Sequence, residues 1–143
     1  MADDRRAPER KRYSYHCPVR WSDMDVYGHV NNARMLTLYE EARVDLMFKG
    51  ARERGLTSFE AGIVISRHEV DYLRPVDYGD SVRIEMWVEE IRASRFTIAY
   101  ELFDRDVVTS RARSVCVPFN LEQHYPRRLT PEERAFLEEW VGT

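Results

Sequence analysis

The spacing of apolar residues divides the chain into a strand, a helix and a series of further strands. The first segment is rich in aromatic and β-branched side chains and predicts a strand from Tyr13 to Arg20. From Ala33 to about Lys49, apolar side chains recur every three or four residues, as on one face of an α-helix: Met35, Leu38, Tyr39, Ala42 and Leu46. Gly50 is expected to end this helix, before a connector over residues 51–62.

The pattern of apolar and polar residues changes from helical to alternating after the connector and predicts four strands. Their ranges are 63–72, 81–91, 95–103 and 107–119. Pro75 and Gly79 predict a loop between the first two of these strands. The segment from Asp104 to Asp106 predicts a hairpin turn between the last two, so we expect a long antiparallel meander.

A capped helix closes the pattern. Thr130, followed by Pro131 and Glu133, is typical of a helix start, and we expect a short helix that ends near Val141. One apolar helix stripe and one apolar sheet face need each other for burial, so the pattern predicts an α+β fold with one long helix against an antiparallel sheet. We expect a single domain over residues 13–143, after a flexible charged tail over residues 1–12.

Composition narrows the possible partners. The chain has 143 residues and a formal net charge of -3, which gives no overall attraction to nucleic acid or to an anionic membrane. No apolar run reaches membrane-spanning length and the N-terminus has no apolar signal core, which favours a cytoplasmic protein. Cys17 and Cys116 lack the spacing of metal ligands, so we expect free thiols. A chain of this size is expected to need a second subunit to enclose a deep pocket.

The candidate chemistry is concentrated immediately before the predicted long helix. Residues 19–32 place two aspartates, a histidine and two asparagines beside the first helical turn, whose free N–H groups carry partial positive charge. A carboxylate beside such donors can attack an acyl group or activate water while the donors hold the oxyanion. The spacing Asp-x-Asp-x-x-Gly also begins calcium loops, but Tyr27 and Arg34 stand where oxygen ligands are needed, so we expect no metal.

This segment and later ones resemble a known family. The residues that carry the likeness are Asp23-Met-Asp25-Val-Tyr-Gly28-His29-Val-Asn31-Asn32, Glu40-Glu-Ala-Arg43, Asp71-Tyr-Leu-Arg-Pro75 and Gly79-Asp80. They are similar to the 4-hydroxybenzoyl-CoA thioesterase-like branch of the hotdog-fold acyl-CoA thioesterases. The resemblance implies a hotdog fold, in which a five-stranded antiparallel sheet wraps around one long central helix. It also implies a homodimer or a dimer of dimers whose subunits join their sheets and share the acyl-thioester cleft.

The resemblance also implies roles for individual residues. Asp25 corresponds to the catalytic carboxylate, and backbone donors near Asn31 and Asn32 correspond to the group that polarises the thioester carbonyl. Asp25 would act as nucleophile or as general base, and both routes stay open. The two asparagines also fit helix capping. His29 stands where other family members carry an apolar residue, and we expect it to position the thioester or to orient Asp25.

Supporting roles fall to the remaining polar residues. We expect Asp23 and Gly28 to shape the loop. Glu41 is an alternative catalytic carboxylate, because another hotdog branch carries its catalytic glutamate on the central helix. Arginines near the strands are available to hold the phosphates of a CoA substrate: Arg67, Arg74, Arg83, Arg95, Arg111 and Arg113.

The expected function is hydrolysis of an acyl-CoA thioester to a free acid and CoA. This reaction needs a carboxylate, water and an oxyanion hole, so we expect no cofactor; coenzyme A enters as part of the substrate. An acyl-carrier-protein thioesterase and a non-catalytic acyl-thioester-binding dimer are the alternatives. The expected partners are the small-molecule thioester and a second copy of the chain, without nucleic acid or a membrane.

Overall fold

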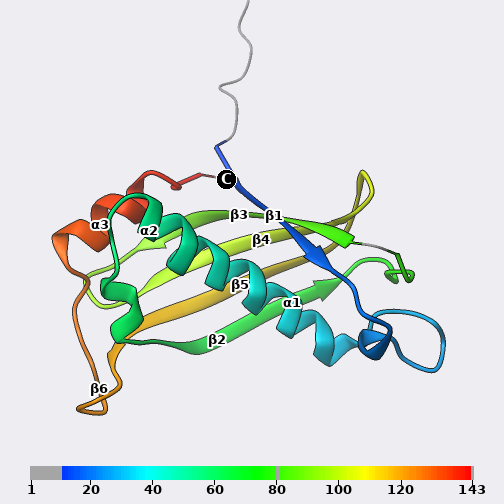
Figure 1. Cartoon of the computed structure of the whole chain (residues 1–143), viewed down its shortest axis with the longest axis horizontal. Helices are drawn as coiled ribbons and strands as arrows, with labels where there is room; N and C mark the ends of the chain where they lie inside the picture. The colour runs from blue at the N-terminus through cyan, green and yellow to red at the C-terminus, as the bar shows by residue number, and fades with distance from the viewer. Residues whose placement is uncertain (1–10, 80, 143) are drawn as a thin grey trace, which may run out of the picture.

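A single antiparallel sheet frames the structure, a computed structural model that describes residues 11–79 and 81–142. The strands are β1 (Tyr13–Pro18), β2 (Ile63–Tyr72), β3 (Ser81–Ile91), β4 (Phe96–Asp104), β5 (Val107–Asn120) and β6 (Tyr125–Pro126). Their order is β1-β3-β4-β5-β2, and the short β6, which the sequence did not predict, pairs with the end of β5 (Figure 1). β3, β4 and β5 form the predicted meander, whereas β2 lies at the far edge and pairs with β5.

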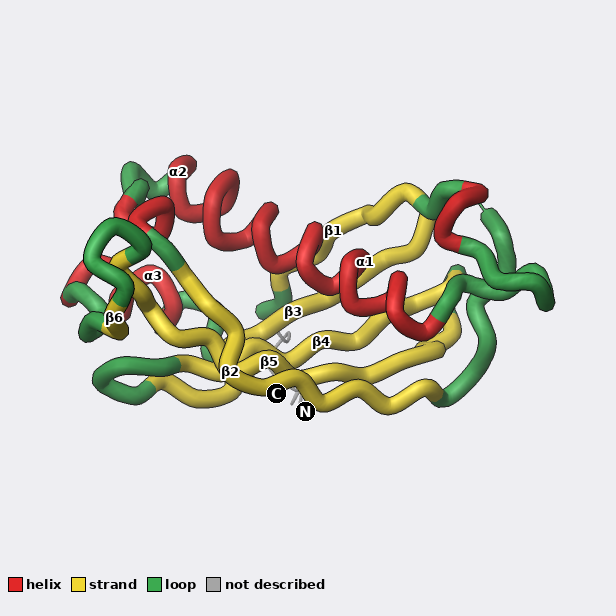
Figure 2. Tube along the Cα trace, turned by 90° about the horizontal axis from the view of Figure 1, so that it is seen from below, coloured by secondary structure: helices red, strands yellow, loops and turns green. Residues whose placement is uncertain are grey.

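One continuous helical run crosses the concave face of this sheet (Figure 2). It consists of α1 (Asn32–Val44), a π-helical turn (Asp45–Gly50) and α2 (Ala51–Glu53). Short 3₁₀ turns precede and follow it at Trp21–Asp23 and Ser58–Ala61, and α3 (Pro131–Glu138) packs beside β3. The predicted arrangement of an antiparallel sheet around a long central helix is confirmed. No helix in the described part of the chain is long and apolar enough to cross a membrane.

Alternation along the central strands explains why the sheet packs on the helix. Every second residue of β3 and β4 is buried in the core: Val82, Ile84, Met86, Val88, Phe96, Ile98, Tyr100 and Leu102. The predicted helix stripe supplies the opposite side of this core. Each large apolar side chain buried in this way stabilises the fold by about 1.5–3 kcal/mol relative to exposure, so this interface holds the domain together.

Gly50 does not end the central helix, and that prediction was wrong. The helical run passes through Gly50 to Glu53, and Gly55 follows its end with a φ of 77°. A β-carbon on Gly50 would lie 3.1 Å from Cε2 of Tyr13. Glycine is therefore suited to this position because the ring of a distant strand packs closely against the helix.

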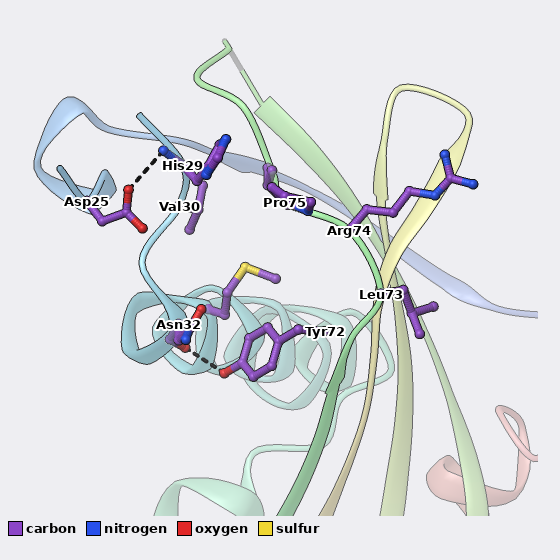
Figure 3. Close-up of a pocket in the computed structure, with 10 residues that line it drawn as sticks. Asp25, His29, Val30, Asn32, Tyr72, Leu73, Arg74 and Pro75 are labelled. Carbon is purple, nitrogen blue, oxygen red and sulfur yellow. Dashed lines mark hydrogen bonds between the residues drawn. The ribbon is translucent and has the colours of Figure 1, made fainter. Parts of the chain in front are cut away.

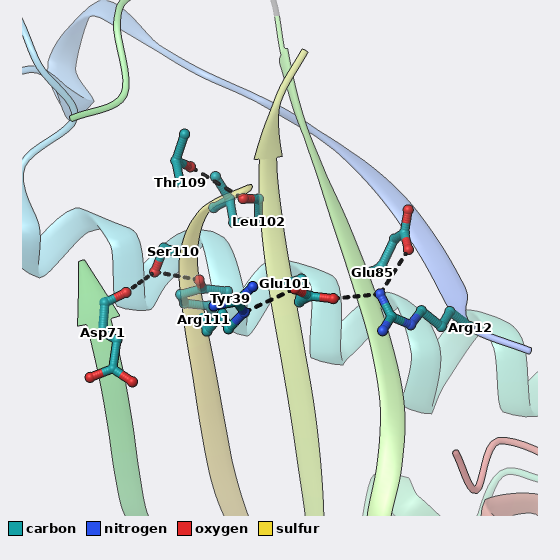
Figure 4. A network of polar contacts seen from close by, with 9 residues as sticks. All are labelled: Arg12, Tyr39, Asp71, Glu85, Glu101, Leu102, Thr109, Ser110 and Arg111. Carbon is teal, nitrogen blue, oxygen red and sulfur yellow. Dashed lines mark hydrogen bonds and ion pairs between the residues drawn. The ribbon is translucent and has the colours of Figure 1, made fainter. Parts of the chain in front are cut away.

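The two ends of the domain also differ from the prediction. The C-terminal helix ends at Glu138 rather than near Val141, because the following residues join the sheet. The N–H of Val88 donates to the carbonyl of Trp140 at 2.8 Å, and the N–H of Gly142 donates to the carbonyl of Val88 at 3.1 Å. Most of the predicted flexible tail lies outside the described residues. Its last residue, Arg12, contacts the outer face of the sheet, with Nη1 2.6 Å from Oε1 of Glu101 (Figure 4).

A hydrogen-bond chain ties α1 to the edge of the sheet. The Tyr39 hydroxyl donates to Oγ of Ser110 at 2.7 Å, and the Ser110 hydroxyl donates to the carbonyl of Asp71 at 3.0 Å (Figure 4). Burial raises the pKa of Tyr39, so its phenol stays protonated and keeps its donor. The middle of α1 is therefore held in place relative to the end of β2.

We expect Gly62→Ala to destabilise the fold by about 2 kcal/mol. Gly62 has a φ of 142°, and an added β-carbon would lie 2.6 Å from the carbonyl oxygen of Phe119 and 2.6 Å from Cγ of Leu121. Gly55→Ala is the matched control, because it also has a positive φ but no atom lies within 4 Å of an added β-carbon. Urea unfolding measures both variants. Equal losses would show that backbone conformation, and not the close contact, sets the cost.

Candidate active site

The loop between β1 and α1 is organised around the buried carboxylate of Asp23. Its Oδ2 accepts a hydrogen bond from the N–H of Arg20 at 2.8 Å, and its Oδ1 accepts one from the Arg20 guanidinium at 3.3 Å. Burial alone would raise the pKa of this carboxyl, but the bonds from Arg20 outweigh burial and the pKa is lowered. The Asp23 carbonyl also accepts the N–H of Asn31 at 2.8 Å. Asp23 therefore closes the loop onto the start of α1.

Asp25 lies in a turn at the tip of this loop and commits one carboxylate oxygen to the backbone. Its Oδ1 accepts the N–H groups of Tyr27 at 2.8 Å and of His29 at 3.2 Å. Gly28 has a φ of 78°, and its N–H donates to the Asp25 carbonyl at 3.2 Å. The residue is half-buried, and its Oδ2 accepts no hydrogen bond from the described residues. This second oxygen is available to a substrate or to water.

The first turn of α1 presents a free backbone donor. Asn31 caps the helix, because its Oδ1 accepts the N–H of Ala33 at 2.9 Å while its own N–H is bonded to Asp23. Asn32 is the first helical residue, and within residues 11–79 and 81–142 its N–H has no hydrogen-bond partner. Asn32 therefore keeps a free N–H at the positive end of the helix dipole, whereas the side chain of Asn31 caps the helix.

Asp25, His29 and Asn32 line one cavity of about 260 Å³ (Figure 3). Its walls also include Met35 of α1 and the segment that follows β2, residues 72–76. Pockets that enclose a whole drug-sized ligand usually hold about 300–1,000 Å³. The cavity of a single chain is therefore large enough for the reacting end of an acyl thioester but small for the whole molecule.

The wall formed by residues 72–76 was not assigned from the sequence. The Tyr72 hydroxyl donates to the carbonyl of Asn32 at 2.7 Å, and the N–H of Val30 donates to the carbonyl of Val76 at 2.9 Å. Nε2 of His29 lies 3.6 Å from Oδ1 of Asp77, the residue that follows this segment. A proline soon after a strand end, as in Tyr72-Leu-Arg-Pro75, predicts a turn there but does not say which loop the turn contacts.

A sequence profile of the Thioesterase-like superfamily matches residues 19–141, from the end of β1 to the C-terminal segment. The chain belongs to this superfamily. It is similar to 1,4-dihydroxy-2-naphthoyl-CoA hydrolase of Synechococcus elongatus, with 27% identity over 134 residues that cover 90% of this chain and 94% of the relative. The membership inferred from the sequence motifs is confirmed.

Solved thioesterase structures share the fold. A protein from Bacillus stearothermophilus, described as a predicted thioesterase, has a TM-score of 0.80 and 29% identity, covering 92% of this chain and 97% of the other. A thioesterase from Thermus thermophilus, complexed with coenzyme A and zinc, has a TM-score of 0.72 and 27% identity, with 89% and 92% of the two chains covered. The predicted hotdog fold is confirmed.

Glu41, the alternative carboxylate of this thioesterase-like chain, lies outside the cavity that contains Asp25. It borders a separate hollow between α1 and β1, beside Tyr15 and Val44. The Cys17 thiol donates to Oε2 of Glu41 at 3.0 Å, and burial together with this carboxylate raises the pKa of the thiol. A single chain therefore does not bring Glu41 to the free donor of Asn32.

Among the arginines considered for phosphate binding, Arg74 alone lines the cavity that contains Asp25. Four others form ion pairs with glutamates: Arg67, Arg83, Arg111 and Arg113. Arg95 lies in the turn between β3 and β4. No cluster of three or more His, Cys, Asp or Glu side chains suited to a metal ion is found in the described ranges. A site without metal or cofactor stays a prediction.

Proposed function

We propose that this chain is a homodimeric acyl-CoA thioesterase that hydrolyses R–CO–S–CoA to a carboxylic acid and free CoA. One observation carries the proposal: the carboxylate of Asp25, with one oxygen free, and the first residue of α1, Asn32, line the same cavity. A thioester carbonyl placed between them would be polarised by the Asn32 N–H while it faces the carboxylate. Membership of the thioesterase superfamily and a relative named as a CoA-thioester hydrolase support the same reaction.

Both chemical routes available to Asp25 use this arrangement. As general base, Oδ2 takes a proton from water, whose oxygen attacks the carbonyl carbon. As nucleophile, Oδ2 attacks that carbon itself and forms a mixed anhydride that water then hydrolyses. In both routes the tetrahedral oxyanion faces the Asn32 N–H, the C–S bond breaks, and its electron pair leaves on the sulfur of CoA, which then takes up a proton. His29 would position the thioester at the cavity rim.

A second copy of the chain would complete the pocket at β2. This strand pairs only with β5 among the described residues, so its other edge is free along ten residues. The edge begins with half-buried Ile63, Val64 and Ile65 and leads to Tyr72 and Leu73, which are each 48% exposed. Two copies related by a two-fold axis and paired along β2 would run antiparallel. The start of one β2 would then lie beside the cavity at the end of the other.

CoA is the carrier that the surface near the cavity favours. An acyl carrier protein would need a basic docking surface, whereas Arg74 is the one arginine in the cavity lining and Asp25 and Asp77 lie nearby. The cytoplasmic location predicted from the sequence is part of this proposal.

Thiol release by the purified protein tests the proposed activity. The substrates are straight-chain acyl-CoAs of increasing length and a bicyclic aromatic acyl-CoA, each compared with the same acyl group on an acyl carrier protein. We expect turnover of at least one CoA thioester at about 1–100 s⁻¹, as in ordinary enzymes, and slower release from the carrier protein. Binding of acyl-CoA with no thiol released would instead identify a binding protein, and a preference for the carrier protein would contradict the proposed carrier.

A further inference from the structure

The hydroxyl of Tyr72 joins the end of β2 to the first residue of α1. It donates a hydrogen bond to the carbonyl of Asn32 at 2.7 Å, and the ring lies in the wall of the cavity that contains Asp25 (Figure 3). Tyr72 pairs with Ser110 of β5, which is fully buried, so both side chains lie on the helix side of the sheet. The bond therefore runs from the sheet to the residue that carries the proposed oxyanion donor.

The backbone at the end of β2 is itself held by hydrogen bonds. A serine hydroxyl of β5 donates to the carbonyl of Asp71, the residue before Tyr72, at 3.0 Å. The N–H groups of the two residues after Tyr72 donate to the carbonyl of Thr109 at 2.9 and 3.1 Å. Because the backbone is held on both sides of Tyr72, its side chain can hold Asn32 in turn.

Asn32 lies between two peptide planes that are both held by hydrogen bonds. The plane before it contains the free N–H of Asn32, and the carbonyl of this plane, from Asn31, accepts the N–H of Met35 at 3.1 Å. The plane after it contains the carbonyl that accepts the Tyr72 hydroxyl. The N–H groups of a first helical turn have no acceptor within the helix, so contacts from outside must hold this turn. The bond from Tyr72 therefore sets the direction of the free N–H relative to the sheet.

The hydroxyl of Tyr72 is suited to holding a neighbouring group and not to transferring a proton. Burial raises the pKa of this phenol above its ordinary value of about 10, so the hydroxyl keeps its proton at neutral pH. That proton is directed to the carbonyl of Asn32 and not into the cavity. An oxyanion donor is most effective when its direction is set before the reaction begins.

We propose that Tyr72 is a positioning residue of this active site: its hydroxyl holds Asn32 so that the N–H at the helix end is directed at the thioester carbonyl. The inference rests on the thioester hydrolysis proposed above and adds the group that sets the direction of its oxyanion donor. A displacement of about 1 Å in an active site can lower the rate about 10²-fold. Because the oxyanion forms only in the transition state, the loss belongs to kcat and not to KM.

Tyr72→Phe tests the proposal, because it removes the hydroxyl and keeps the ring in the cavity wall. We expect kcat for thiol release to fall about 10–100-fold with an unchanged KM. Tyr13→Phe is the matched control: the Tyr13 hydroxyl donates to Oδ2 of Asp45 at 2.5 Å and also joins a strand to the central helical run, but outside the cavity. We expect this control to release thiol at the wild-type rate. A Tyr72→Phe protein with wild-type kcat, or with a raised KM and an unchanged kcat, overturns the proposal.

A proline at position 32 shows whether Tyr72 acts through the N–H of Asn32. Asn32→Pro removes this N–H and suits the first position of a helix, and Asn31 before it already has the extended conformation that a following proline requires. We expect Tyr72→Phe to cause no further loss of kcat in the Asn32→Pro protein. Losses that multiply would show independent effects and overturn the proposal. Asn32→Ala, which keeps the N–H, is measured beside it to account for the lost side chain.

Nuclear magnetic resonance separates this inference from the proposed function and does not depend on the folding of Asn32→Pro. We expect the order parameter of the Asn32 N–H to fall in Tyr72→Phe and to keep its wild-type value in Tyr13→Phe. If wild type releases no thiol from any acyl-CoA, the proposed function fails, and the order parameter alone decides whether Tyr72 holds Asn32. If wild type is active and Tyr72→Phe equals it in kcat, the positioning role fails and the thioesterase stands.

Discussion

Asp25→Asn is expected to lower kcat for thiol release about 10²–10⁴-fold while the protein stays folded. The amide has nearly the same shape, and its oxygen can still accept the N–H groups of Tyr27 and His29 that hold the turn. It cannot take a proton from water or attack the thioester. Thiol release, together with a thermal unfolding curve of each protein, measures the loss at constant fold.

Asp106→Asn is the matched control for this variant. Asp106 lies fully exposed in the turn between β4 and β5 and does not line the cavity, so its amide should release thiol at the wild-type rate. If Asp25→Asn is as active as wild type, Asp25 is not the catalytic group, and Glu41→Gln becomes the next variant to measure. A single turnover in ¹⁸O-labelled water tests the nucleophilic route, because isotope found in Asp25 would require water to attack the aspartyl carbonyl of the anhydride.

Arg127→Met is expected to lower the free energy of unfolding by about 3–5 kcal/mol. Glu133, at the start of α3, is fully buried, and its two oxygens accept hydrogen bonds from Nη1 and Nη2 of Arg127 at 2.7 and 2.9 Å. The Ser58 hydroxyl donates to the same carboxylate at 2.9 Å and links α3 to the turn before β2. Without Arg127, Glu133 would remain a buried carboxylate with no cation.

Arg128→Met controls for the loss of one arginine in the same segment. Arg128 is exposed, and the contact it makes with Arg127 uses its backbone carbonyl, which the substitution keeps. Urea unfolding of both variants gives the comparison. Similar stabilities would show that the pair of Arg127 and Glu133 contributes little beyond the packing of its side chains.

The ion pair of Arg127 and Glu133 predicts that the stability of the fold falls in acid. Burial alone would raise the pKa of Glu133. The hydrogen bonds from Arg127, the Thr130 backbone and Ser58 outweigh burial, so the pKa is lowered on folding. Such a carboxyl stabilises the fold fully above its unfolded pKa of about 4.3, and the contribution is lost as the pH falls through the folded value. Glu133→Gln should therefore lose less stability than wild type below about pH 4.3. An equal loss would assign the acid sensitivity to other carboxyls.

Among the periodic elements, two strands were predicted with the bounds that the structure shows, whereas the long helix continues to Glu53, beyond its predicted end. β2 and β3 cover Ile63–Tyr72 and Ser81–Ile91, as alternation indicated. Gly50 was misassigned because the reason for a glycine there is the ring of Tyr13, which belongs to another element. The sequence did not predict β6 because alternation cannot be recognised in a strand of two residues.

Some features of the candidate site were likewise predicted from the sequence, and others became visible only in the tertiary structure. The order of elements, the membership of the thioesterases and the place of Asp25 before the long helix all follow from patterns among neighbouring residues. Packing between distant segments was needed to show that Asn32 and not Asn31 keeps its N–H free, and that residues 72–76 form the other wall of the cavity. These features depend on which groups meet across the fold, and no local spacing in the chain encodes such a meeting.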